Sequence, residues 1–117
     1  MLRYKAAKFQ MEFLMEKDPR LSHQTLRVLR LFEEQPKVSL AGSDISKQTG
    51  MLSGTIYPIM MRLERAGWLS SQWENLDPSD AGRPRRRLYR LTGLGYNKSR
   101  AALAELGVPS GRIAWNS

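Results

Sequence analysis

The chain has 117 residues and a formal net charge of +8, which suits one domain with a modest core and a polyanionic partner such as nucleic acid or an anionic membrane surface. The absence of cysteine excludes disulfides and cysteine-based zinc sites, and the single histidine, His23, argues against a metal site or a His-based triad. No apolar run approaches the roughly 20 residues of a membrane span, and the charged N-terminus lacks the apolar core of a secretory signal. We therefore expect a cytoplasmic protein with no enzymatic activity, no cofactor and no membrane partner.

The first two predicted elements are amphipathic helices. Residues 2–17 carry apolar side chains at spacings of three to four residues, with charged side chains between them. Asp18 and Pro19 then end this helix, or cap a second helix that is predicted over residues 21–34.

The following segment has the pattern of a helix-turn-helix. Residues 39–42 are predicted as a connection, and Ser43 as the N-cap of a short helix over residues 44–49. Gly50 lies where a left-handed residue would end that helix, and Ser53 can cap the next one. This third helix has an inward apolar stripe, formed by Ile56, Ile59, Met60 and Leu63. A short helix, a glycine-containing turn and a second amphipathic helix indicate a helix-turn-helix.

A β-hairpin is predicted after the third helix. Residues 68–74 are predicted as one strand and residues 85–91 as its antiparallel partner, with turn formers in the loop over 75–84. At about ten residues this loop is longer than a tight hairpin turn, which fits a wing that projects from the domain. Trp68 and Trp73 are expected to pack beneath the hairpin.

The C-terminal part is predicted as one more helix, over residues 93–106, with Thr92 as its cap and a tail after it. The expected fold class is α+β, mainly α with a small β-hairpin: a winged helix-turn-helix with additional N- and C-terminal helices. Its expected divisions are an N-terminal helix, a winged helix-turn-helix DNA-binding domain, a C-terminal helix and a flexible tail, over residues 1–18, 19–92, 93–107 and 108–117.

Several short motifs occur in an order that is typical of one family. They are GSDISK at 42–47, SGTIYP at 53–58, RLE at 62–64, GWL at 67–69, SQWE at 71–74, GRPRR at 82–86 and YRLT at 89–92. On these residues the chain resembles the PadR family of bacterial winged-helix transcriptional regulators. The resemblance implies a homodimeric repressor that dimerises through its C-terminal helix, helped by the N-terminal one, and many such proteins respond to a small-molecule inducer. Because the C-terminal helix is short here, we expect the helix over 2–17 to supply part of the dimer contact.

Four side chains of the third helix are candidates for a DNA interface. Ser53, Thr55 and Met61 are expected to face the major groove, where a hydroxyl or methyl group can contact base edges, and ordinary surface positions are the alternative. Tyr57 would hydrogen-bond a phosphate through its phenol, or else cap the core as a half-buried side chain. This helix offers no Asn or Gln and its arginines come late, so specificity would depend partly on DNA shape.

The remaining candidates are basic. Lys47 and Arg62 are expected to contact phosphates, although Arg62 could pair instead with a local acid on the helix surface or with Glu74. Four arginines of the hairpin complete the set: Arg83, Arg85, Arg86 and Arg87. We expect at least two of them to contact phosphate or the minor groove, and strand alternation would place Arg85 and Arg86 on opposite faces. The alternative is a solvated basic edge that prevents strand-to-strand association.

The sequence therefore predicts a sequence-specific, double-stranded DNA-binding transcriptional regulator, and the resemblance implies a homodimeric repressor. The alternative is a winged-helix interaction module that binds an acidic partner through the same arginines. The two differ in salt dependence, because DNA binding weakens steeply with salt through counterion release. No nucleophile–base pair or metal cluster is visible in the sequence that would indicate an enzyme.

Overall fold

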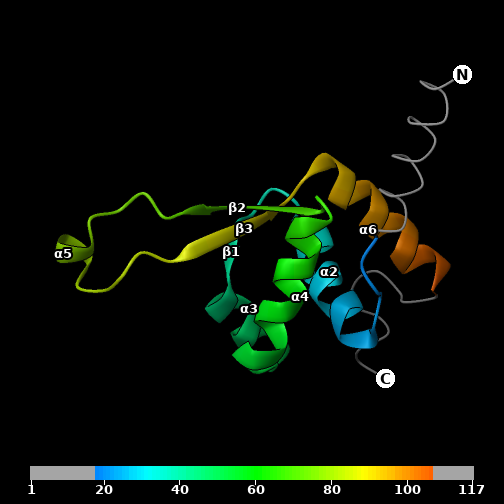
Figure 1. Ribbon diagram of the computed structural model, residues 1–117, viewed down its shortest axis with the longest axis horizontal. Coiled ribbons are helices and arrows are strands. Elements are labelled where there is room, and N and C mark those ends of the chain that lie inside the picture. The colour runs from blue at the N-terminus through cyan, green and yellow to red at the C-terminus, as the bar shows by residue number, and fades with distance from the viewer. Residues whose placement is uncertain (1–17, 107–117) are drawn as a thin grey trace, which may run out of the picture.

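The computed structural model describes residues 18–106 of the chain (Figure 1). The helix predicted over residues 2–17 and the tail predicted over 108–117 lie outside this range. In chain order the elements are α2 (His23–Glu34), β1 (Leu40–Ala41), α3 (Gly42–Thr49), α4 (Ser53–Arg65), β2 (Leu69–Trp73), α5 (Pro78–Ala81), β3 (Arg87–Leu91) and α6 (Gly93–Glu105). Helices dominate and the strands form one small sheet, which confirms the predicted α+β class. Among the described helices, none combines the length and the apolar character needed to cross a bilayer.

The arrangement is that of a winged helix-turn-helix. Helices α2, α3 and α4 lie together on one side of the sheet, and α6 lies beside α2 (Figure 1). Helices α3 and α4 form the helix-turn-helix. The hairpin of β2 and β3 extends far beyond the helices and ends at α5 (Figure 1). We call this hairpin, residues 69–91, the wing.

Helix α2 begins later than the sequence pattern indicated, because Ser22 caps it. The Ser22 Oγ accepts a hydrogen bond from the backbone N–H of Thr25, at 3.2 Å. Asp18 and Pro19 therefore precede the helix and do not cap it. Asp18 instead forms an ion pair with Lys98 of α6, with 3.0 Å between the Lys98 Nζ and the Asp18 Oδ2, which joins the segment before α2 to the last described helix.

The two caps predicted for the helix-turn-helix are wrong by one or two residues. Helix α3 begins earlier than expected, and the Asp44 carboxylate accepts a hydrogen bond from the Ala41 N–H at 2.9 Å. Asp44 thus binds back to the start of its helix, while Ser43, the predicted cap, is exposed. Helix α4 begins at Ser53 itself, and its N-cap residue is Leu52, whose side chain cannot accept a hydrogen bond from the first turn.

The turn between α3 and α4 has the geometry that its glycine predicted. Gly50 ends α3 with a φ of 75°, in the left-handed region that favours glycine, and its N–H donates to the Ser46 carbonyl at 2.8 Å. The Ser46 hydroxyl donates in turn to the carbonyl of Met51, at 2.7 Å. These bonds set the angle at which α4 leaves α3.

The sheet has three antiparallel strands in the order β1-β3-β2, one more than the predicted hairpin. Strand β1 pairs Leu40 with Tyr89 and Ala41 with Leu88. It lies in the segment that the sequence pattern indicated as a connection. Two residues are too few to show an alternating pattern, so only their pairing with β3 identifies them as a strand.

The wing has shorter strands and a longer loop than predicted. Strands β2 and β3 have five residues each, and their outermost pair is Trp73 opposite Arg87. Arg85 and Arg86 therefore precede β3, and the alternation expected for them along a strand does not apply. The tip of the loop forms α5, a single helical turn capped by the Asp77 side chain, which the sequence analysis did not predict.

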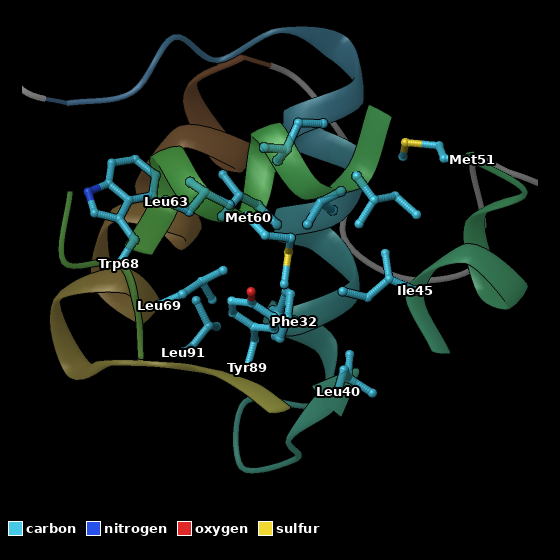
Figure 2. Close-up of a cluster of buried hydrophobic side chains, with 14 residues drawn as sticks. Phe32, Leu40, Ile45, Met51, Met60, Leu63, Trp68, Leu69, Tyr89 and Leu91 are labelled. Atoms are coloured by element: carbon cyan, nitrogen blue, oxygen red, sulfur yellow. The ribbon is translucent and has the colours of Figure 1, made fainter. Parts of the chain in front are cut away.

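The core lies between α2, α4 and the sheet (Figure 2). The stripe predicted for α4 is buried as expected, at Ile56, Ile59, Met60 and Leu63. Trp68 is also buried, but Trp73 is 60 % exposed, so the predicted packing role is right for Trp68 and wrong for Trp73. The reason is geometric, because Trp73 lies at the outer end of β2, where the wing has passed beyond the helices (Figure 1).

Helix α6 packs closely against the start of β2. Thr92 caps it as predicted, and its Oγ1 accepts a hydrogen bond from the Gly95 N–H at 2.9 Å. A Cβ on Gly95 would lie 1.9 Å from the carbonyl oxygen of Trp68. Glycine is therefore required at this position by the close approach of two backbones.

Candidate nucleic-acid interface

The outer face of α4 is formed by residues at helical spacing. Gly54, Pro58, Met61 and Arg65 recur at i, i+4, i+7 and i+11, and all four are exposed opposite the buried stripe. Nothing lies within 4 Å of the place that a Cβ on Gly54 would occupy, so a ligand can approach the backbone there. Met61, at 48 % exposed, was predicted from the sequence, whereas the other three were missed although the helical period could have identified them.

The other groove candidates differ in exposure. Ser53 is exposed at the first position of α4, as expected for a groove-facing hydroxyl, but Thr55 is only partly exposed and lies toward the flank of the helix. Leu52, the residue before α4, is 78 % exposed. Leu52 was not among the candidates predicted from the sequence.

Tyr57 joins the two helices of the helix-turn-helix. A Cβ on Gly42, the first residue of α3, would lie 2.9 Å from both the Cζ and the Oη of Tyr57. The phenol ring therefore lies directly against the backbone of Gly42. Tyr57 is still 45 % exposed, which agrees with the half-buried position that was one of the two alternatives.

Lys47 and Arg62 are exposed, on α3 and α4 respectively. Within residues 18–106 neither side chain forms an ion pair or hydrogen bond, and the alternative pairing of Arg62 with Glu74 is not present. Arg62 instead lines a hollow of about 500 Å³ together with Arg20 and Arg65. These cations are available to an anionic partner.

Two of the four wing arginines bind the carboxylate of Glu74. The Arg83 guanidinium donates to both Glu74 oxygens, at 2.7 and 3.1 Å. Arg86 donates to the same carboxylate from its backbone N–H at 2.9 Å and from its guanidinium at 3.2 Å. The hydrogen bonds from Arg83, followed by those from Arg86, lower the pKa of Glu74 from its usual 4.5 to about 2 against the opposing effect of burial.

The other two wing arginines differ from each other in their contacts. Arg85 is exposed and donates only its Nε to a protein acceptor, the carbonyl of Leu76 at 2.7 Å. Arg87 donates its Nε to the Ser71 hydroxyl at 2.9 Å, and its guanidinium lies 5.1 Å from the centroid of the Trp73 ring. Arg87 also lies within ion-pair distance of Glu64, so among the described residues only Arg85 of the four has no acidic partner.

The base of the wing is attached to both helices of the helix-turn-helix. The Arg86 guanidinium lies 3.6 Å from the Asp44 carboxylate of α3, and the Arg87 guanidinium lies 4.0 Å from the Glu64 carboxylate of α4. The Ser71 hydroxyl of β2 donates to Glu64 as well. The base of the wing is therefore fixed relative to α3 and α4.

The outer face of α4 and the wing offer cations, hydroxyl groups and exposed apolar side chains. Within the described part of the chain, no three His, Cys, Asp or Glu side chains gather in a way that would hold a metal ion. The available groups are those that bind phosphates and base edges.

Comparisons with solved structures agree with this geometry. The chain is 23 % identical to a PadR family transcriptional regulator from Eggerthella lenta, with a TM-score of 0.57, over 92 % of this chain and 89 % of that one. A PadR family transcription regulator from Clostridium difficile gives 21 % identity and a TM-score of 0.59, over 72 % and 86 % of the two chains. The Staphylococcus aureus MepR–DNA complex gives 17 % identity and a TM-score of 0.59, over 89 % and 77 %. At these identities the likeness establishes the fold.

Comparison with sequences gives the family. No functionally curated protein matches the chain significantly. The profile of the Transcriptional regulator PadR-like family matches residues 28–101, which run from α2 to α6. Because this match covers more than half of the chain and includes the helix-turn-helix and the wing, the protein belongs to the PadR-like family of transcriptional regulators.

Proposed function

We propose that the protein is a sequence-specific regulator that binds double-stranded DNA through α4 and the wing. The observation that carries the proposal is the joining of an exposed α4 face to a projecting basic hairpin through Asp44, Glu64 and their arginines. With 13 residues, α4 is about 20 Å long at 1.5 Å per residue, and a helix fits the major groove of B-DNA. The wing would then lie along the flanking backbone.

Each candidate residue has a role in this proposal. Ser53, Thr55 and Met61 would contact base edges, with Thr55 at the margin of the interface. Tyr57 would donate to a phosphate while its ring holds α4 against α3. Lys47 and Arg62 would contact phosphates on either side of the groove. The wing would contribute at least two of its arginines, which are Arg83, Arg85, Arg86 and Arg87.

We further propose a homodimer that acts as a repressor, as is usual for the family. Leu94 and Leu106 of α6 are about half exposed, and a partner subunit would cover such apolar side chains. The dimer contacts would come from residues 1–18 and 93–107, on either side of a DNA-binding domain over 19–92. The MepR–DNA complex, whose protein shares this fold, supports the DNA-binding part of the proposal. An inducer, if one binds, would act on the dimer.

A second candidate is an interaction module that binds an acidic protein. The observation in its favour is the exposed Trp73 beside Arg87, since aromatic and arginine side chains are common anchors at protein interfaces. This candidate predicts that duplex DNA does not compete with the partner.

The test is selection of sheared genomic DNA on the purified protein at physiological salt, followed by sequencing. We expect a short inverted repeat with half-sites about one helical turn apart, as a two-fold symmetric dimer requires. Recovery of unenriched DNA would contradict sequence-specific binding. Recovery of none would contradict DNA binding as a whole and would favour the acidic protein partner, to be sought by pull-down.

A further inference from the structure

Glu74 lies at the base of the wing loop, beside the wing arginines. A carboxylate next to a DNA-binding surface repels phosphate, so its presence needs a reason. Its side chain is only 12 % exposed although the loop around it is open to solvent. All of its hydrogen bonds among the described residues come from Arg83 and Arg86, on the far side of the loop.

These contacts close the loop between β2 and β3. Beyond the outermost strand pair, the Glu74 N–H donates to the Arg86 carbonyl at 2.9 Å, and the Arg86 N–H donates to the Glu74 carboxylate at the same distance. Arg83 reaches back to that carboxylate across nine residues of chain. A loop of this length would otherwise sample many conformations, and binding DNA would have to order it.

We propose that Glu74 is a positioning residue for DNA binding, which holds Arg83 and Arg86 inside the wing so that the loop presents Arg85 to the phosphates. The inference rests on the proposed function and assigns separate roles to the wing arginines. Arg83 and Arg86 then serve the shape of the wing, and Arg86 also joins it to α3 through Asp44. Arg85 keeps its two terminal nitrogens available, because only its Nε binds a protein acceptor.

The proposal and simple electrostatics predict opposite results for one substitution. Glu74→Gln removes a negative charge near the DNA, which by Coulombic repulsion alone would tighten binding about twofold. If Glu74 positions the wing, the same change weakens binding about five- to tenfold, because two arginines and their loop must be ordered on the DNA instead.

The matched control is Asp80→Asn. Asp80 is an exposed acid in α5 of the same loop, and it forms no hydrogen bond or ion pair with residues 18–106. Its neutralisation removes the same charge from the same wing without touching the Glu74 contacts. We therefore expect Asp80→Asn to leave binding unchanged or slightly tighter.

The experiment measures fluorescence anisotropy of a short labelled DNA duplex with the full chain, at two salt concentrations, after thermal unfolding has shown that each variant folds. Glu74→Gln should weaken binding. In that background Arg83→Gln should have little further effect, because its partner is already gone, whereas Arg85→Gln should retain its full effect. Tighter binding by Glu74→Gln, or equal effects of the two arginine substitutions in its background, overturns the proposal.

A second measurement needs no DNA. Trypsin cleaves after arginine, and an exposed loop is cleaved faster when it is less ordered. We expect Glu74→Gln to be cut after Arg85 and Arg86 several times faster than the wild type, and Asp80→Asn at the wild-type rate. An unchanged cleavage rate overturns the positioning role of Glu74. Failure of the wild type to bind any duplex overturns the proposed function instead, so the two failures are distinguishable.

Discussion

Replacement of Gly95 by alanine should destabilise the protein, whereas the same replacement at Gly93 should not. Both glycines lie in the first turn of α6. A Cβ on Gly95 would lie 1.9 Å from the carbonyl oxygen of Trp68 and 2.6 Å from its carbonyl carbon, while nothing lies within 4 Å of a Cβ on Gly93. Ordinary contact begins at about 3.4 Å, so α6 would have to move about 1.5 Å away from Trp68.

The magnitude follows from these distances. Forcing an extra methyl group into a packed site lowers the free energy of unfolding by up to about 3 kcal/mol. We take this upper value because the atoms that a Cβ on Gly95 would meet belong to the backbone of Trp68. Alanine offsets up to about 1 kcal/mol of this by its greater helix propensity. The net loss of about 2 kcal/mol corresponds to a fall in Tm of roughly 8–16 °C for a domain of this size.

Thermal unfolding of both variants by circular dichroism, at one protein concentration, checks this expectation. Concentration must be matched because the Tm of a dimer depends on it. Gly93→Ala should stay within about 1 kcal/mol of the wild type. If Gly95→Ala melts within a few degrees of Gly93→Ala, α6 does not pack against Trp68 as described and the reasoning is refuted.

Three further outcomes are expected. Arg85→Gln should reduce the slope of log affinity against log salt by about 0.9 per protomer, for one lost phosphate contact. Arg90→Gln should reduce this slope less, because Arg90 lies on the face of β3 that is turned away from the core. Equal reductions would contradict the proposed orientation. Removal of residues 1–17 should weaken the dimer in sedimentation, and an unchanged dimer would assign dimerisation to α6 alone. Because folding lowers the pKa of Glu74 from 4.5 to about 2, its contribution to the free energy of unfolding should be complete above about pH 4.5 and lost as the pH falls through about 2. Denaturant titrations of the wild type and Glu74→Gln measure this difference, and a decline beginning well above that window would contradict it.

Much of the fold could be predicted because its signals are local. The apolar period of α4, the left-handed Gly50 and the Thr92 cap each act within one or two turns of chain, and each lies where the sequence indicated. The errors at Ser43 and Ser53 are also local. At Ser43 a competing side chain close by, Asp44, binds the start of α3, and at Ser53 the helix begins one residue earlier than expected, with no side-chain cap.

The site was harder to predict than the fold. The sequence indicated a basic hairpin, but could not tell which arginines keep free donors, because their partners are distant along the chain. Glu74 binds residues nine and twelve positions away. Likewise the sequence indicated a projecting wing but did not show that Trp73 lies on the part that extends beyond the helices, where it is exposed (Figure 1).

By itself the sequence determined that this chain is a basic winged helix-turn-helix of the PadR-like family, because periodicity, turn glycines and motif order are properties of neighbouring residues. Only the tertiary structure decided how that fold is used. It showed β1 by its pairing, the contact of Tyr57 with Gly42, and the Glu74 carboxylate between Arg83 and Arg86. Such contacts depend on where separate segments meet in space. The sequence pattern alone therefore does not indicate that the Glu74 carboxylate binds two arginines.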